Sequence, residues 1–181
     1  MQSKHAAWAA VAALGLLPSL AGCRQSAPPA AAQQASALVG QKAPAFSATL
    51  HNGDTFDVSA QNGKVVVADF WATWCGPCRQ SIPVLQKLHE KYQDKGLVIV
   101  GISDETQKDV EPFAKENAMT YALSSHADNN NTQQQYGVQA LPTLVAIDKK
   151  GVVRSVEVGI DPATFEQTLE SLVVKLLAES A

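Results

Sequence analysis

The sequence predicts a mixed α/β fold, in which a central β-sheet is flanked by helices. The order of the segments supports this class, and the length bounds the number of domains. From residue 41 onward, short apolar segments alternate with segments of helical periodicity, and the chain then closes with two strands and a helix. The length of 181 residues, 46% of them hydrophobic, suits one domain with residues left over for a leader or linker.

The domain is expected to begin with a β-hairpin and a buried strand. Strands at 46–50 and 55–58 flank Asn52-Gly53, which favours a two-residue turn because both residues tolerate positive φ. The segment 64–71 contains a continuous apolar run, typical of a central strand that is buried on both faces.

The middle of the chain continues the alternation. Helical periodicity covers 76–93, and an apolar strand follows at 97–102. A helix at 108–117 and a short strand at 121–123 come next. The polar run 129–135 fits either a loop or a short exposed helix. It belongs to a longer stretch between Ser103 and Tyr136, which is expected to be an insertion between the two halves of the fold.

The last part is expected to form a hairpin and a helix. Strands at 143–147 and 152–158 are joined by a turn at 148–151. Asp161 can cap the final helix, with Pro162 in its first turn. The apolar face of this helix is formed by Phe165, Leu169, Leu172, Val173 and Leu176.

Composition excludes several classes of protein. Lys and Arg number 14 against 17 Asp and Glu, a net charge of −3, so no basic excess indicates binding to nucleic acid. Three cysteines are too few for a disulfide-stapled scaffold. No apolar run in the body of the chain approaches the roughly 20 residues that a membrane helix needs.

The N-terminus has the order of a secretory signal, with Lys4 before an apolar stretch at 6–20. It ends in Leu20-Ala21-Gly22-Cys23, which resembles the lipobox of bacterial lipoproteins. This resemblance implies a signal peptide at 1–22 and lipidation, palmitate included, of Cys23. Residues 23–40 lack bulky side chains and are expected to form a flexible tether before a domain at 41–181. The alternatives are an ordinary secreted protein and an uncleaved anchor.

The chemistry is indicated by Cys75-Gly76-Pro77-Cys78 at the start of the predicted helix. Two cysteines three residues apart on a helix lie about one turn from each other, so they can interchange between a dithiol and a disulfide. Cys75, at the helix N-terminus, is favoured as a thiolate and is the expected nucleophile. Cys78 is then the resolving thiol, and Pro77 suits the first turn.

Other uses of a Cys-x-x-Cys pair fit less well. A zinc site would need a second pair or suitably spaced histidines, whereas His51, His89 and His126 are scattered and are assigned structural or solvated roles. Covalent haem attachment would need a histidine in place of Arg79. A structural disulfide over so small a loop would stabilise little. We therefore expect no metal and no cofactor.

The segment 68–78 resembles the active-site strand and helix of thioredoxins, and Pro83 falls where thioredoxins kink that helix. The segment 136–143 resembles the thioredoxin segment that carries a cis-proline. The resemblance covers about 42–178. The signal peptide, the leading hairpin and the insertion are more similar to the extracytoplasmic TlpA/ResA branch of thiol-disulfide oxidoreductases.

This resemblance implies roles for further residues. Asp69 would be buried and would move protons for the resolving cysteine, although strand alternation alone favours an outward position. The Leu141–Pro142 bond would be cis and would offer a backbone edge to substrates. Trp74 would border the docking surface, with Gly76 and Pro77 supporting the active site.

The first functional hypothesis is a membrane-tethered reductant of disulfides in exported proteins, for example in cytochrome c maturation. Its partners would be these substrates and a transmembrane electron donor, and the protein would act as a monomer in the periplasm or an equivalent extracytoplasmic space. The second hypothesis is a peroxiredoxin-like peroxidase, although alanine at position 72 replaces the threonine of that motif. The third is a copper metallochaperone.

Overall fold

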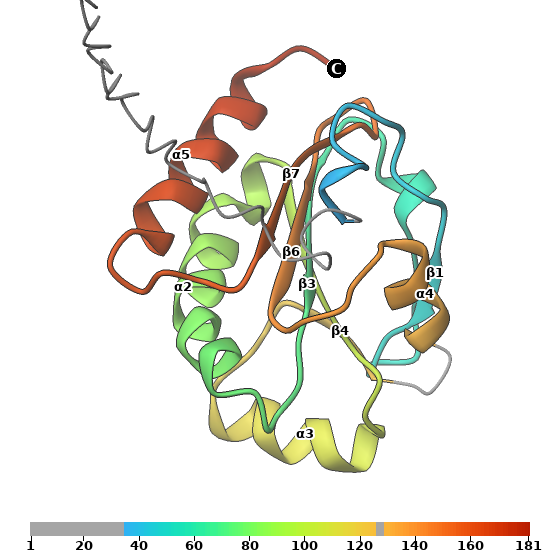
Figure 1. Cartoon of the computed structure of the whole chain (residues 1–181), viewed down its shortest axis with the longest axis vertical. Helices are drawn as coiled ribbons and strands as arrows, with labels where there is room; N and C mark the ends of the chain where they lie inside the picture. Colours follow the sequence, from blue (N-terminus) through green and yellow to red (C-terminus); the bar gives the residue numbers. More distant parts are fainter. Residues whose placement is uncertain (1–34, 126–128) are drawn as a thin grey trace, which may run out of the picture.

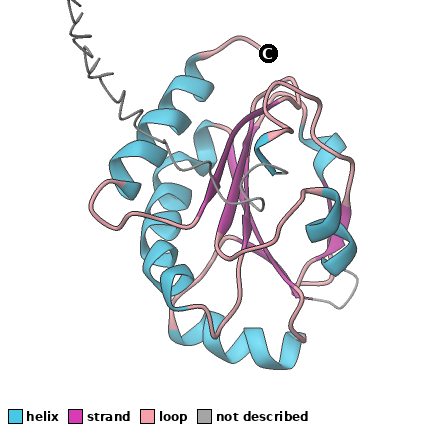
Figure 2. Ribbon diagram, in the orientation of Figure 1, coloured by secondary structure: helices cyan, strands magenta, loops and turns pink. Residues whose placement is uncertain are grey.

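A five-stranded mixed sheet lies at the centre of the structure (Figure 2). Its strand order is β5-β4-β3-β6-β7, in which β3, β4 and β5 are parallel to one another and β6 runs antiparallel to both of its neighbours. The strands are β3 (Val65–Phe70), β4 (Leu97–Ser103), β5 (Ala122–Ser125), β6 (Thr143–Ile147) and β7 (Val153–Val158). All six residues of β3 are buried, as expected for the central strand.

Helices α2 (Gly76–Tyr92) and α5 (Phe165–Ala178) cover one face of this sheet, and α3 (Gln107–Glu116) lies at its lower end (Figure 1). Side chains from all three helices join one apolar core with the facing side chains of the sheet. A short 3-10 turn, η2 (Gln93–Lys95), connects α2 to β4. The predicted fold class, a mixed sheet flanked by helices, is confirmed.

The opposite face is covered by the N-terminal hairpin of β1 (Ser47–Thr49) and β2 (Thr55–Asp57), the 3-10 turn η1 (Val58–Gln61) and α4 (Asn129–Gln135) (Figure 1). An aromatic cluster holds the hairpin against the sheet. The ring of Tyr136 lies 5.7 Å from that of Phe46 and 5.5 Å from that of Phe70. Of the two structures expected for the polar run at 129–135, a loop or a short helix, the structure has the helix, α4.

The hairpin turn differs from the two-residue turn expected at Asn52-Gly53. The Leu50 amide donates to the Asp54 carbonyl at 2.8 Å, so three residues, 51–53, form the loop. Gly53 alone of the expected pair has a positive φ, of 87°. The Asn52 side chain accepts from the Asp54 amide at 3.1 Å, and this local bond favours the longer loop.

The final helix also begins later than predicted. Asp161 was expected to cap it, but α5 starts at Phe165, with Thr164 at the N-cap and no side-chain capping bond. The Asp161 carboxylate instead accepts from the Ala163 amide and the Thr164 hydroxyl, at 3.0 and 3.2 Å. These bonds stabilise a separate turn before the helix.

The computed structural model describes residues 35–125 and 129–181. Residues 35–40, just before the expected domain boundary, already contact the domain: the Gly40 amide donates to the Val153 carbonyl at 2.8 Å, and Leu38 packs on the core. The signal peptide, Cys23 and most of the expected tether lie outside the described residues. Within the described ranges, no helix is both long enough and apolar enough to cross a membrane.

Candidate active site

Cys75 and Cys78 form a disulfide at the N-terminus of α2. Cys75 is the N-cap residue, and its Sγ accepts a hydrogen bond of 3.2 Å from the Cys78 amide. Cys75 is 4% exposed, whereas Cys78 is fully buried. After reduction, the amide and the helix dipole stabilise a thiolate on Cys75, so the more accessible sulfur is also the better nucleophile.

The surface beside Cys75 is formed by its neighbours in sequence. The Trp74 side chain is 70% exposed, which is unusual for so large an apolar group, and Gly76 and Pro77 are exposed as well. An apolar ring next to a reactive sulfur provides a surface on which a polypeptide could dock.

Asp69 lies within β3 and is fully buried. It pairs with Gly101 of β4 and Leu144 of β6, and neither carboxylate oxygen has a hydrogen-bond partner among the described residues. Burial raises the pKa of Asp69 to about 7. Since alternate residues of a strand share a face, Asp69 lies on the same face as Val65 and Val67, the face covered by α2.

The inward position that the resemblance implied for Asp69 is therefore the observed one. Cys78 projects from α2 into the same core. A carboxyl group that gains and loses its proton near neutral pH is suited to general acid–base chemistry on the buried thiol.

The Leu141–Pro142 bond is cis, as the resemblance implied. Thr143, the next residue, pairs with Phe70 at the end of β3. The bond therefore directly precedes β6, beside the end of β3 from which the chain runs on to the two cysteines. Leu141 is half-buried and packs against the core that contains both cysteines. The structure thus places all the expected residues within the domain at one end of the sheet.

A network that the sequence analysis missed holds the loop before Cys75. The Glu105 carboxylate accepts from the Thr73 amide and the Thr73 hydroxyl, each at 2.7 Å. Arg79 Nε donates to the Thr73 carbonyl, also at 2.7 Å, and its guanidinium lies 5.2 Å from the centre of the Phe113 ring. All polar groups of Thr73 are thereby fixed. No pattern in the sequence indicates this contact, because Thr73 and Glu105 are 32 residues apart.

In the part of the chain that the structure describes, no three His, Cys, Asp or Glu side chains come together in a way that could hold a metal ion. The groups that the structure brings together here are the two sulfurs, one buried carboxyl group and an exposed apolar surface.

Comparison with known proteins places this site in a family. The AhpC/TSA family model matches residues 39–156. The chain belongs to the AhpC/TSA family. It is 36% identical over 136 residues to the thioredoxin-like protein YneN of Bacillus subtilis, covering 72% of this chain and 78% of YneN. It is 34% identical to the thiol-disulfide oxidoreductase ResA of Bacillus thuringiensis, covering 74% of each chain.

Solved structures agree with this membership of the AhpC/TSA family. The chain is similar to a Chlorobium tepidum protein described as a thiol:disulfide interchange protein DsbE, with a TM-score of 0.72 and 33% identity over 77% of this chain and 98% of that one. Together with the Cys75–Cys78 pair, these relatives identify the chain as a thiol-disulfide oxidoreductase of the ResA/DsbE type.

Proposed function

We propose that this oxidoreductase is a reductant of disulfides in exported proteins, such as apocytochromes c before haem attachment. The observation that carries the proposal is the Cys75-Gly76-Pro77-Cys78 sequence at the helix start, with Asp69 buried behind it. Cys75 attacks the substrate disulfide, and a mixed disulfide forms while one substrate thiolate leaves. Cys78 then gives up its proton to Asp69 and attacks Cys75, which releases the second substrate thiol and leaves the enzyme oxidised.

The arrangement around the sulfurs supports a protein as the substrate. Trp74 presents an exposed apolar ring, and the backbone before β6 at Leu141–Pro142 offers an edge for strand-like pairing. A small-molecule substrate would be better served by a closed pocket, whereas Cys75, the cysteine that keeps some exposure, lies next to the widely exposed ring of Trp74.

We place the protein outside the cytoplasm, tethered to the membrane by lipids on Cys23 and acting as a monomer. A single acyl chain binds membranes only marginally, so the tether requires the several chains of a bacterial lipoprotein. A reductant in an oxidising compartment needs a supply of electrons. Its second partner is therefore a transmembrane protein that reduces the Cys75–Cys78 disulfide, whereas nucleic acid is not a partner.

The two other hypotheses predict different reactions. A peroxidase would reduce hydrogen peroxide at a single cysteine, but alanine at position 72 removes the hydroxyl that the peroxidatic motif supplies. A copper chaperone would bind Cu(I) through the reduced pair, which is chemically feasible for two thiolates. Neither hypothesis gives a role to the buried carboxyl group of Asp69.

The deciding experiment compares three assays on the same preparation. We expect the purified protein to catalyse the reduction of insulin by dithiothreitol and the Cys75→Ser variant to lose this activity completely. Peroxide turnover above that of free thiols, with no insulin reduction, would establish a peroxidase. Stoichiometric Cu(I) binding without either activity would favour the chaperone.

A further inference from the structure

Several buried polar atoms without hydrogen-bond partners lie on the side of the sheet to which Asp69 points. Among the described residues, six buried side-chain nitrogen or oxygen atoms have no hydrogen-bond partner, and five of them belong to four residues of one core. These residues are Asp69, Trp71, His89 and Tyr121, which come from β3, the loop after it, α2 and the approach to β5. Buried polar groups are nearly always satisfied, and where protein partners are missing, ordered water takes their place.

Gly101 leaves room for two of these groups, Trp71 and Tyr121, beside Asp69. It lies between Asp69 and Leu123 in the sheet register, so its missing side chain would point to the same face as the carboxyl group. A Cβ atom at this position would be 2.9 Å from Trp71 Nε1 and 3.3 Å from Tyr121 Cε2. The indole N–H and the tyrosine ring therefore occupy the space beside Asp69 that a side chain at Gly101 would fill.

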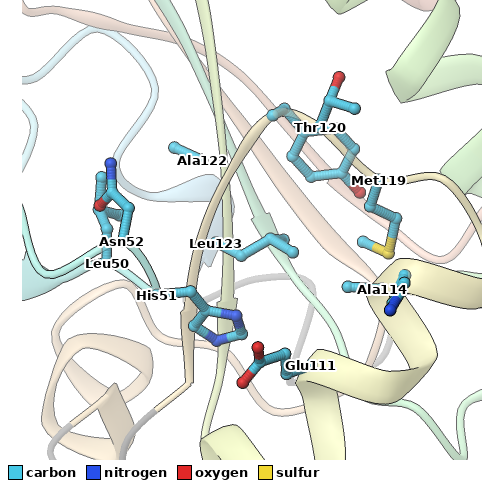
Figure 3. A pocket seen from close by; sticks show the side chains of 11 residues that line it. Leu50, His51, Asn52, Glu111, Ala114, Met119, Thr120, Ala122 and Leu123 are labelled. Carbon is cyan, nitrogen blue, oxygen red and sulfur yellow. The ribbon is translucent and has the colours of Figure 1, made fainter.

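Tyr121 also reaches a pocket that opens to solvent. This pocket has a volume of about 460 Å³ and lies between α3, β5 and the hairpin loop. Figure 3 shows the imidazole of His51 and the carboxylate of Glu111 facing each other on one side of it, with Met119 and Ala114 on another. A space of this size with polar groups in its lining holds several water molecules.

We propose that Tyr121 is the positioning residue through which Asp69 exchanges its proton with water in this pocket. The proposal rests on the role of Asp69 set out above. It gives a function to the buried Tyr121 hydroxyl, which has no hydrogen-bond partner among the described residues, and to the pocket between α3, β5 and the hairpin loop.

The proton balance of the resolving step defines what Tyr121 does. Cys78 gives its proton to the Asp69 carboxylate and forms a bond to the Cys75 sulfur, while the bond from Cys75 to the substrate sulfur breaks. The substrate thiolate takes a proton from solvent, and Asp69 is left as a carboxylic acid. The Tyr121 hydroxyl accepts this proton, directly or through one water, as it donates its own to water in the pocket, so Tyr121 itself is unchanged.

The charges around Tyr121 are compatible with such a relay. Burial, with the added effect of the Asp69 charge, raises the pKa of Tyr121 well above its ordinary value, so the phenol stays neutral during turnover. The ring of His89 on α2 lies 6.3 Å from the Tyr121 ring, and burial lowers the pKa of His89, so this neighbour is neutral as well. Glu111 and Lys115 of α3, with His51 of the hairpin loop, face the pocket side.

The test isolates the step in which Asp69 loses its proton. All proteins carry Cys23→Ser, so that Cys75 and Cys78 are the reacting thiols. Each is converted at pH 5 to the mixed disulfide of Cys75 with thionitrobenzoate and is then mixed rapidly with buffer at pH 8.5. At pH 5 Asp69 is protonated, and release of thionitrobenzoate after the jump reports attack by Cys78.

We expect Tyr121→Phe to slow this release by roughly tenfold, less than the 10²–10⁴-fold that a general acid or base contributes itself. The solvent deuterium isotope effect on the release should also increase, because proton departure becomes limiting. A merely structural role would not change the isotope effect. The matched control is Tyr136→Phe, which removes the hydroxyl of an equally buried tyrosine on the opposite face of the sheet and should leave both quantities unchanged.

Two results would overturn the proposal, and they differ in what else they overturn. If Asp69→Asn changes the pH dependence of the release but Tyr121→Phe alters neither its rate nor its isotope effect, the relay is wrong and the role of Asp69 stands. If Asp69→Asn behaves like the parent protein, the role of Asp69 fails and the relay fails with it.

Discussion

The buried carboxyl group of Asp69 makes the stability of the protein depend on pH, and the substitution Asp69→Asn should remove this dependence. In the unfolded chain, Asp69 titrates at the ordinary value of 3.8, whereas burial raises its pKa in the native protein to about 7. Between these two pH values the native state binds the proton and the unfolded state does not. Stability is therefore greatest below pH 3.8 as far as this group is concerned, and it falls as the pH rises towards 7.

The size of the effect follows from the difference of about three pH units. At 1.36 kcal/mol per unit, the full loss is about 4 kcal/mol, of which roughly 2.5 kcal/mol falls between pH 5 and pH 8. This is a large part of the 5–15 kcal/mol by which ordinary domains are stable. Asn cannot ionise, so the Asp69→Asn variant lacks this contribution at every pH.

The assay is urea unfolding of the oxidised protein at pH 5, 6, 7 and 8, with and without Asp69→Asn. The other titrating groups are common to both proteins, so the difference between the two slopes isolates Asp69. The matched control is Asp148→Asn, because the Asp148 carboxylate accepts bonds from the Val152 amide and from Arg154, and its pKa is lowered. Its stabilisation is lost only in acid, so this variant should keep the parent slope above pH 5. Equal slopes for the parent and Asp69→Asn would refute the reasoning.

Three further predictions concern the cysteines and the loop beside them. Cys75→Ser should abolish the reduction of substrate disulfides, whereas Cys78→Ser should accumulate mixed disulfides with substrates, visible on non-reducing gels. If Cys75→Ser trapped substrates instead, the roles of nucleophile and resolving thiol would be reversed. Glu105→Ala should lower the free energy of unfolding by about 1.5–3 kcal/mol, because it removes the carboxylate that accepts two bonds from Thr73. Glu105→Gln should lower the free energy of unfolding by less, and an unchanged value in both variants would show that the carboxylate does not hold the loop. Cys23→Ala should move the protein from the membrane fraction to the soluble fraction or leave an unprocessed precursor, and a mature protein that begins at any other residue would exclude the lipid anchor.

The elements that could be predicted from sequence are those determined by local patterns. The apolar run of β3 and the Cys-x-x-Cys motif at the start of α2 both lie within short continuous segments, and the structure places them as expected. The burial of Asp69 needed more than the local pattern. Strand alternation permits either face, and the resemblance to thioredoxins indicated the correct one.

Features that depend on contacts between distant segments could not be predicted. The bonds from Glu105 to Thr73 and the packing of Tyr121 against Gly101 arise only when β3, β4 and β5 are paired. The predicted start of the last helix was wrong, and the reason is local. Asp161 has two uses for its carboxylate, a helix cap or a separate turn, and the sequence does not distinguish between them.

The measurement that tests the central claim most directly is the reduction potential of the Cys75–Cys78 pair. The protein is equilibrated with glutathione buffers of known potential, and the fraction of reduced thiol is determined by alkylation. The intervening Gly76-Pro77 is the thioredoxin dipeptide, so we expect a value near the thioredoxin potential of about −270 mV. A value near the roughly −120 mV of the strong periplasmic oxidants would make the protein an oxidant, and the proposed function would be wrong.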